Sequence, residues 1–420
     1  MSEIVNIKKN IAWNTIGSVT YSICQWIITI LVVYISTYED AGYLSLAMTT
    51  SSSFSTIALF SMRNYQVSDV KGEYSQNEYV GSRITTCILA FVCCAIGAFF
   101  GNSLYQVLCI VSFMLVRIVE AFVDVLHGEN QKFNKYDYIG KSYLLRGVLT
   151  AVSFSIGLFV TKDILITLFI MAICNLLVAL LFDWRLTSKL ETIKPVLFSK
   201  LVKELLIKCL PLVIFTFLLS LENLIPKNVL QQLLGTEQLG IYSTMASPTL
   251  IVQVFASVVF SPLLPEFSKV YYAEKFDEFR NKLRKVFFGL LIMAAGVTVL
   301  AMIFGRLGLR LLFGQSILEH YYMFMPIVWV TILTAFIWII SSLVIVIRRI
   351  KLLLIGMLID FGICVAIVNP CILAFGKNGV SIVQIIVYAL FVAYMVILCE
   401  VALSKDKRVK AKEFANEKVE

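Results

Sequence analysis

The sequence predicts an all-α integral membrane protein, with about twelve transmembrane helices arranged in two six-helix lobes. Hydrophobic residues occupy 59% of the 420 positions and charged residues only 15%, which is too little polar surface for a water-soluble chain of this length. The apolar residues also gather in runs of about 20, the length that an α-helix needs to cross the hydrocarbon core. Lipid is therefore expected to contact most of the surface.

The apolar runs are separated by short links that alternate with longer, basic connections. The expected spans are 11–35, 41–62, 83–101, 104–126, 143–161, 164–182, 208–228, 240–262, 286–305, 321–346, 353–375 and 379–402. The longest basic connection lies between the sixth and the seventh span. We therefore expect an N-terminal lobe at 1–182, a cytoplasmic linker at 183–207, a C-terminal lobe at 208–402 and a basic tail at 403–420.

The basic residues favour one side of the membrane. If the N-terminus is inside, 30 of the 36 Lys and Arg residues fall in the terminal segments and the loops of that side, including 63–83 and 132–146. By the positive-inside rule, both termini are predicted to be cytoplasmic. This distribution also accounts for the net charge of +9, so no nucleic-acid partner is expected.

The linker at 183–207 contains an amphipathic stretch after Pro195. Its apolar face is predicted to be Leu197, Leu201 and Leu205. A helix of this kind is expected to rest at the lipid interface.

The two halves share a short motif in front of their second span. Residues 39–45 read EDAGYLS and residues 237–243 read EQLGIYS, so each has Glu-x-x-Gly followed shortly by Ser. Because each half has six spans, both halves begin on the same side. The repeat is therefore predicted to be parallel, with a pseudo-two-fold axis along the membrane normal and a central cavity.

Several segments resemble a known family. They are 8–14 (KKNIAWN), 38–45 (YEDAGYLS), 63–69 (RNYQVSD), 233–243 and 262–265 (PLLP). They are similar to the bacterial oligosaccharide repeat-unit flippases of capsule and O-antigen assembly, in the multidrug/oligosaccharidyl-lipid/polysaccharide exporter superfamily. The resemblance covers essentially the whole chain.

The resemblance implies two lobes of six helices around a polar cavity in the bacterial plasma membrane. It implies transfer of an undecaprenyl-pyrophosphate-linked oligosaccharide from the inner to the outer leaflet by alternating access. Membrane lipid, and a polysaccharide polymerase with other assembly proteins, are the partners expected on this basis. The alternative on the same fold is an ion-coupled multidrug efflux transporter.

One predicted span carries three ionisable residues, which are costly at membrane depth. Arg117, Glu120 and Asp124 are spaced i, i+3 and i+7, which places them on one helical face. Arg117 is a candidate contact for pyrophosphate because a guanidinium group can bind phosphate with two parallel hydrogen bonds. The alternative is an Arg117–Glu120 ion pair that holds helices together. Asp124 is a candidate for ion coupling or a solvated residue near the interface.

Polar residues in two later spans are further candidates. Glu222, Asn223 and Lys227 would form a polar patch in the seventh span, with Glu222 as a proton or cation site or as one half of a structural pair. Asp360, in the eleventh span, is a candidate coupling carboxylate or a neutral, interfacial one.

Single polar residues complete the candidate site. Gln25 would bond sugar hydroxyls or bridge helices, and Arg63 would recruit the anionic head group or anchor its span. His127 and His320 are expected to be solvated. The sequence has no nucleotide-binding G-x-x-x-x-G-K-[ST] loop and no catalytic or metal-ligand spacing, so neither an enzyme nor a resident cofactor is expected. Coupling to H⁺ or Na⁺ stays open.

Overall fold

The structure is a computed structural model, and it describes residues 2–69, 73–197, 199–249, 251–253, 256, 260 and 263–417. Within these ranges, the side chains of 2–9, 11, 64, 68, 265 and 411–417 are not described. All regular elements of the described residues are helices. This confirms the predicted all-α membrane class.

The helices of the first half are α1 (Ser2–Ile35), α2 (Tyr38–Leu59), α3 (Met62–Ser68), α4 (Gln76–Ala98), α5 (Leu104–Lys132), α6 (Tyr136–Thr161), α7 (Ile164–Val178), the π-helix η1 (Ala179–Trp184), α8 (Arg185–Thr187), α9 (Lys200–Leu234) and α10 (Thr236–Ala246). The later ones are η2 (Ser247–Thr249), α12 (Leu264–Tyr272), α13 (Phe276–Phe313), η4 (Ser316–Met323), α14 (Phe324–Val346), α15 (Ile350–Phe375) and α16 (Asn378–Glu417).

Ten helical segments of the described part are long and apolar enough to cross a membrane. They match ten of the expected spans. The span expected at 41–62 is helical as α2, but α2 is rich in Ser and Thr and is not among the ten. The span expected at 240–262 extends beyond α10 into residues outside the described ranges. The number of twelve spans therefore stays a prediction.

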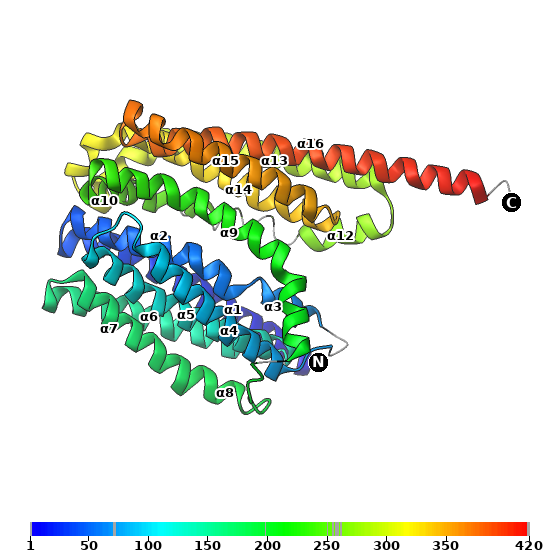
Figure 1. The fold of residues 1–420 in the computed structure, drawn as a ribbon, viewed down its shortest axis with the longest axis horizontal. Helices are drawn as coiled ribbons and strands as arrows, with labels where there is room; N and C mark the ends of the chain where they lie inside the picture. The colour runs from blue at the N-terminus through cyan, green and yellow to red at the C-terminus, as the bar shows by residue number, and fades with distance from the viewer. Residues whose placement is uncertain are drawn as a thin grey trace. The chain divides into compact units, whose positions relative to one another are not determined.

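The chain divides into two compact units, 1–244 and 245–420. In the first unit, α1, α2 and α4–α7 run side by side (Figure 1), and α1 packs along α6 while α5 contacts α2, α4 and α7. In the second unit, α16 packs on both α14 and α15. The division assigns α9 to the first unit by its contacts with α2 and α4. It does not test the predicted six-plus-six repeat, which stays a prediction.

The end of the linker and the seventh span form one bent helix, α9 (Figure 1). Pro211 lies inside it and removes one backbone hydrogen bond, a common cause of a bend. Of the predicted apolar face, Leu205 is fully buried within the protein and Leu201 is 40% exposed, so its contact with lipid stays a prediction. The face of α9 that packs against Tyr79 and Val80 is that of Leu205, Cys209 and Val213.

The two copies of the repeated motif meet within the first unit. A Cβ atom on Gly42 would lie 2.1 Å from the carbonyl oxygen of Thr236, and one on Gly240 would lie 1.8 Å from that of Tyr38. The hydroxyls of Ser45 and Ser243 are 2.5 Å apart. Only glycine permits such a close approach of two helices, which explains the shared Gly of the motif.

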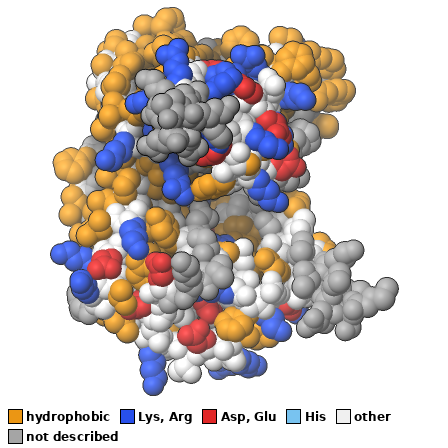
Figure 2. Space-filling view, turned by 90° about the vertical axis from the view of Figure 1, so that its right-hand side faces the viewer, with side chains coloured by type: hydrophobic (Ala, Val, Ile, Leu, Met, Phe, Trp, Pro, Cys, Tyr) orange, Lys and Arg blue, Asp and Glu red, His pale blue; other side chains and the backbone are white. Residues whose placement is uncertain are grey.

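The side chains are sorted by type along the helices. On the face shown in Figure 2, Lys, Arg, Asp and Glu side chains gather at the helix ends, and hydrophobic side chains cover the flanks. This is the distribution expected when the flanks contact lipid and the ends contact water and head groups.

Candidate functional site

A small cavity in the first unit is lined by four helices, and three of them contribute ionisable side chains. Its volume is about 240 Å³. The lining residues are Tyr21, Ser55, Leu59, Arg117, Glu120, Ala121, Asp124, His127, Tyr143 and Arg146. They come from α1, α2, α5 and α6, and we call this space the arginine cavity.

The face of α5 predicted from the sequence lines this cavity. Arg117, Glu120 and Asp124 all belong to the lining. Arg117 Nη1 donates a hydrogen bond of 2.6 Å to Glu120 Oε2, and the guanidinium group lies 5.2 Å from the centre of the Phe113 ring. The expected Arg117–Glu120 ion pair is therefore present and lies at the cavity wall, and contact of Arg117 with pyrophosphate stays a prediction.

Glu120 also receives groups from α1 and α6. The hydroxyl of Tyr21 donates a short hydrogen bond to Glu120 Oε1, and Gln25 Nε2 donates one of 3.1 Å to the Tyr21 hydroxyl. Arg146 Nη2 is 4.0 Å from Glu120 Oε1. The candidate Gln25 thus reaches the cavity indirectly, through a tyrosine that sequence analysis missed.

A seam of glycines positions these groups. A Cβ atom on Gly17 would lie 1.9 Å from the Gly140 carbonyl oxygen, and one on Gly147 would lie 2.9 Å from Tyr21 Cα. Small residues let α1 and α6 approach closely, as is common between membrane helices. Tyr21 lies one turn after Gly17 on α1, and Arg146 lies one turn after Ser142 on α6. The close approach of the two helices places the Arg146 guanidinium group 6.0 Å from the centre of the Tyr21 ring.

Asp124 links two arginines from other helices. Arg63 Nη1 and Arg83 Nη2 are each 3.0 Å from its carboxylate oxygens. Arg83 is fully buried, and its Nη1 atom also donates a hydrogen bond of 2.7 Å to the carbonyl oxygen of Ala58, near the end of α2. The chain turns there through left-handed conformations at Phe60 (φ 49°) and Ser61 (φ 50°). Asp124 is therefore paired, not simply solvated, and Arg63 belongs to this network.

The lining of the arginine cavity holds two arginines and two carboxylates, and two further arginines outside the lining pair with Asp124. Arg63, Arg83, Arg117 and Arg146 face two carboxylates, those of Glu120 and Asp124. The Arg117 Nε atom and the Arg146 Nε and Nη2 atoms are buried and have no hydrogen-bond acceptor among the described residues. Buried donors without acceptors are costly, so an anion entering the cavity would find groups ready to bind it.

His127 is not solvated as expected. Its side chain is 1% exposed, its Nε2 atom lies 3.5 Å from Asp183 Oδ1, and its ring packs 5.0 Å from that of Tyr143. The reason is that α5 extends to Lys132, six residues beyond the predicted span, so His127 lies on a packed helix. Asp183 offsets one of the two excess positive charges near the cavity.

Two arginines of the site were assigned to cytoplasmic loops by the sequence analysis. Arg83 lies in α4 and Arg146 in α6, with 0% and 2% of the residue exposed. That assignment is wrong because helix α4 begins seven residues, and α6 ten residues, before these arginines. Their presence near the ends of apolar runs was the only signal, and it also fits a loop anchor.

The remaining candidates do not line the arginine cavity. Glu222 is fully buried in α9, where Asn223 is exposed and Lys227 half-buried. Asp360 is buried in α15, which belongs to the second unit. Their coupling roles stay predictions.

Comparisons with known proteins agree with this architecture. Residues 7–271 match a family model described as "Polysaccharide biosynthesis protein". The capsular polysaccharide biosynthesis protein CapF of Staphylococcus aureus is 29% identical over 317 residues, which are 74% of this chain and 78% of CapF.

Two solved structures show the same fold. The lipid II flippase MurJ, in an inward closed conformation, aligns with a TM-score of 0.69 and 14% identity over 94% of this chain and 89% of that one. An inward-facing multidrug resistance MATE family transporter of the MOP superfamily aligns with a TM-score of 0.65 and 12% identity, over 96% and 95% of the two chains. At these identities the likeness concerns the fold.

Proposed function

The chain belongs to the family of polysaccharide biosynthesis proteins, and from this we propose that it is a flippase for lipid-linked oligosaccharides. In detail, it would carry undecaprenyl-pyrophosphate-linked repeat units from the inner to the outer leaflet for capsule, O-antigen or exopolysaccharide assembly. A relative named for capsular polysaccharide biosynthesis and the fold shared with a lipid II flippase support the proposal. A polymerase that joins the delivered units is the partner this role implies.

The arginine cavity is the observation that carries the proposal. The sugars and pyrophosphate of such a substrate cannot cross hydrocarbon unaided, so a carrier must offer polar groups at membrane depth. Arg117 and Arg146 would bind the phosphate oxygens through their guanidinium donors. The phosphate would then replace part of the contact of these two arginines with Glu120. Tyr21, which lines the cavity, would bond the adjoining sugar hydroxyls, with Gln25 hydrogen-bonded to its hydroxyl group.

The membrane potential would favour this direction of transport. An inside-negative potential assists outward movement of an anion by about 2.3 kcal/mol per charge per 100 mV. Coupling of transport to H⁺ or Na⁺, with Glu222 or Asp360 as the binding carboxylate, is part of the proposal. Loss of ionophore sensitivity in Glu222→Gln or Asp360→Asn would support that coupling, and unchanged sensitivity in both would contradict it.

The alternative, efflux of cationic drugs, is less favoured by the site. Counting Arg63 and Arg83, the arginines around the cavity outnumber its two carboxylates, which would disfavour a cationic compound. The MATE transporter nevertheless shows that the fold can host drug transport. Drug susceptibility of cells that lack the protein distinguishes the two functions. Hypersensitivity to cationic drugs with normal polysaccharide export would favour efflux.

The direct test is the leaflet location of the lipid-linked oligosaccharide in cells lacking the protein. We expect the oligosaccharide to accumulate on the cytoplasmic face and wild-type protein to relieve the accumulation. Arg117→Ala is expected to fail, and Arg349→Ala, in the second unit, is the matched control that restores export. An unchanged distribution after deletion, in a strain without a second flippase, would overturn the proposal.

A further inference from the structure

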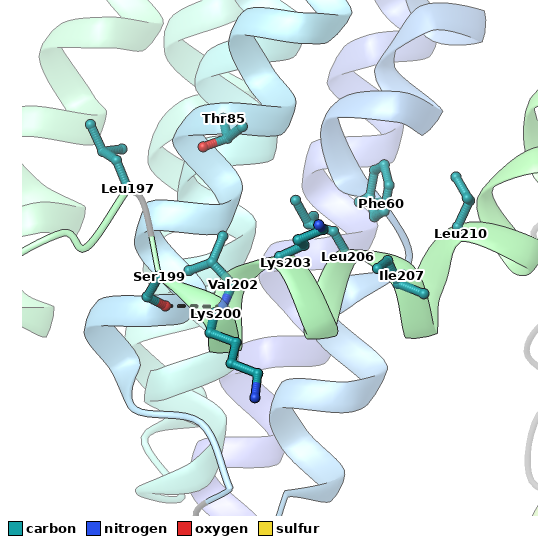
Figure 3. A pocket seen from close by; sticks show the side chains of 10 residues that line it. All are labelled: Phe60, Thr85, Leu197, Ser199, Lys200, Val202, Lys203, Leu206, Ile207 and Leu210. Atoms are coloured by element: carbon teal, nitrogen blue, oxygen red, sulfur yellow. Dashed lines mark hydrogen bonds between the residues drawn. The ribbon is translucent and has the colours of Figure 1, made fainter.

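An apolar groove lies on the first unit, separate from the arginine cavity. It has a volume of about 680 Å³, within the usual range of roughly 300–1,000 Å³ for ligand pockets. Its lining consists of Phe60, Thr85, Leu197, Ser199, Lys200, Val202, Lys203, Leu206, Ile207 and Leu210 (Figure 3). The end of α2, the middle of α4 and the first half of α9 form its walls.

The apolar lining of the groove is open to the surroundings of the helix bundle. Ile207 is 58% exposed, Leu210 44% and Leu197 39%. Pro211 follows directly after Leu210 and cannot hydrogen-bond to the Ile207 carbonyl, at the bend of α9. Water would contact this surface unfavourably, so a hydrocarbon chain is the favoured occupant.

The edge of the groove is cationic. Figure 3 shows the Lys203 side chain lying beside Leu206 over the groove, while the Lys200 side chain extends away from it. Lys200 is 90% exposed at its side chain and lies 3.9 Å from Glu204. Among the described residues, no acidic side chain forms an ion pair with Lys203. The first turn of α9 also has no acidic residue.

From this combination we propose that the groove binds an anionic glycerophospholipid of the bilayer. One acyl chain would lie along Phe60, Leu206, Ile207 and Leu210, and the phosphate would contact Lys203, with Lys200 adding to the positive field. The groove shares no lining residue with the arginine cavity, so this lipid is distinct from the substrate proposed above.

The site has a consequence for transport. Leu59 lines the arginine cavity, and Phe60, the next residue, lines the groove. The chain adopts left-handed conformations at Phe60 and Ser61, so the end of α2 is held there by its neighbours. An acyl chain bound in the groove would pack against this turn, which also borders the arginine cavity. Transport is therefore expected to depend on anionic lipid.

The test uses the purified full-length protein and native mass spectrometry with dioleoyl phosphatidylglycerol or dioleoyl phosphatidylcholine as the probe. Wild-type protein is expected to retain phosphatidylglycerol preferentially. Lys200→Glu combined with Lys203→Glu is expected to lower that retention at least about tenfold. Arg185→Glu combined with Lys189→Glu changes the net charge equally at exposed positions outside the groove and is expected to retain the lipid.

Thr85→Trp would fill the groove without changing a charge and is expected to prevent retention as well. Equal retention of the two lipids, or equal losses in the groove and control variants, would overturn the proposal. Retention by Thr85→Trp would show head-group binding alone and overturn the placement of the chain. A phosphatidylglycerol with a photoreactive acyl chain tests the position of the acyl chain on the wild-type protein. We expect it to label residues 206–210, and labelling elsewhere would contradict the site.

Discussion

The two units use their charges differently. In the first unit, Arg83, Arg146, Glu222 and Asp183 are buried, and Arg146 lines the arginine cavity while Arg83 pairs with its Asp124. Among the described residues of the second unit, Asp360 is the buried charged side chain, and ion pairs such as Arg280–Glu400 lie in exposed or half-buried positions. Buried ionisable groups are costly in a membrane protein, so this difference is the reason that we place the anionic part of the proposed substrate in the first unit.

The largest difference is expected from removing one carboxylate in each unit. Glu120→Gln would leave Arg117 and Arg146 without their counter-charge, at a cost of about 3–5 kcal/mol in the free energy of unfolding. Glu400→Gln, at a side chain that is 35% exposed, should cost less than about 1 kcal/mol. Unfolding of both variants in detergent measures the two values. Equal costs would show that the two charge networks are alike.

Arg146→Lys tests whether the donor geometry matters for transport. Lys keeps the charge but loses the planar fork of donors, so the transport rate should fall about tenfold or more with little loss of fold. Arg349→Lys, paired with Asp406 in the second unit, is the control and should transport normally. Leaflet transfer in proteoliposomes measures both. Normal transport by Arg146→Lys would show that a positive charge at this position is enough and that the donor geometry of Arg146 does not matter.

Glycines provide a third comparison with smaller effects. Gly17→Ala places a methyl group against the Gly140 backbone and must separate α1 from α6, which should cost about 1–3 kcal/mol and displace Tyr21. Gly289→Ala, in α13, meets no atom within 4 Å and should change stability by less than about 1 kcal/mol. Thermal unfolding compares the two. An unchanged stability in Gly17→Ala would show that α1 and α6 are not tightly packed at this contact.

The sequence predicted more of the fold than of the site. The runs of apolar residues located ten spans, and the i, i+3, i+7 spacing placed Arg117, Glu120 and Asp124 on one wall. Tyr21 could not be found in this way, because its contact with Glu120 joins residues 99 positions apart. Arg83 and Arg146 were missed because cations near the ends of apolar runs usually lie in loops.

The phase of α9 shows a second limit. Leu197, Leu201 and Leu205 are correctly spaced for one face, yet Leu197 precedes the helix and Leu201 is exposed. Which face of an amphipathic helix is buried depends on its neighbours, here Tyr79 and Val80 of α4. Such tertiary contacts override a local pattern.

The most direct test of the central claim is binding of undecaprenyl pyrophosphate, as a probe, to the purified full-length protein. We expect Arg117→Gln combined with Arg146→Gln to weaken binding at least about tenfold, because each guanidinium group would supply charge-assisted hydrogen bonds to the phosphates. Arg280→Gln combined with Arg349→Gln, in the second unit, should bind like wild type. If both pairs bind the probe equally well, the arginine cavity does not hold the anionic head group.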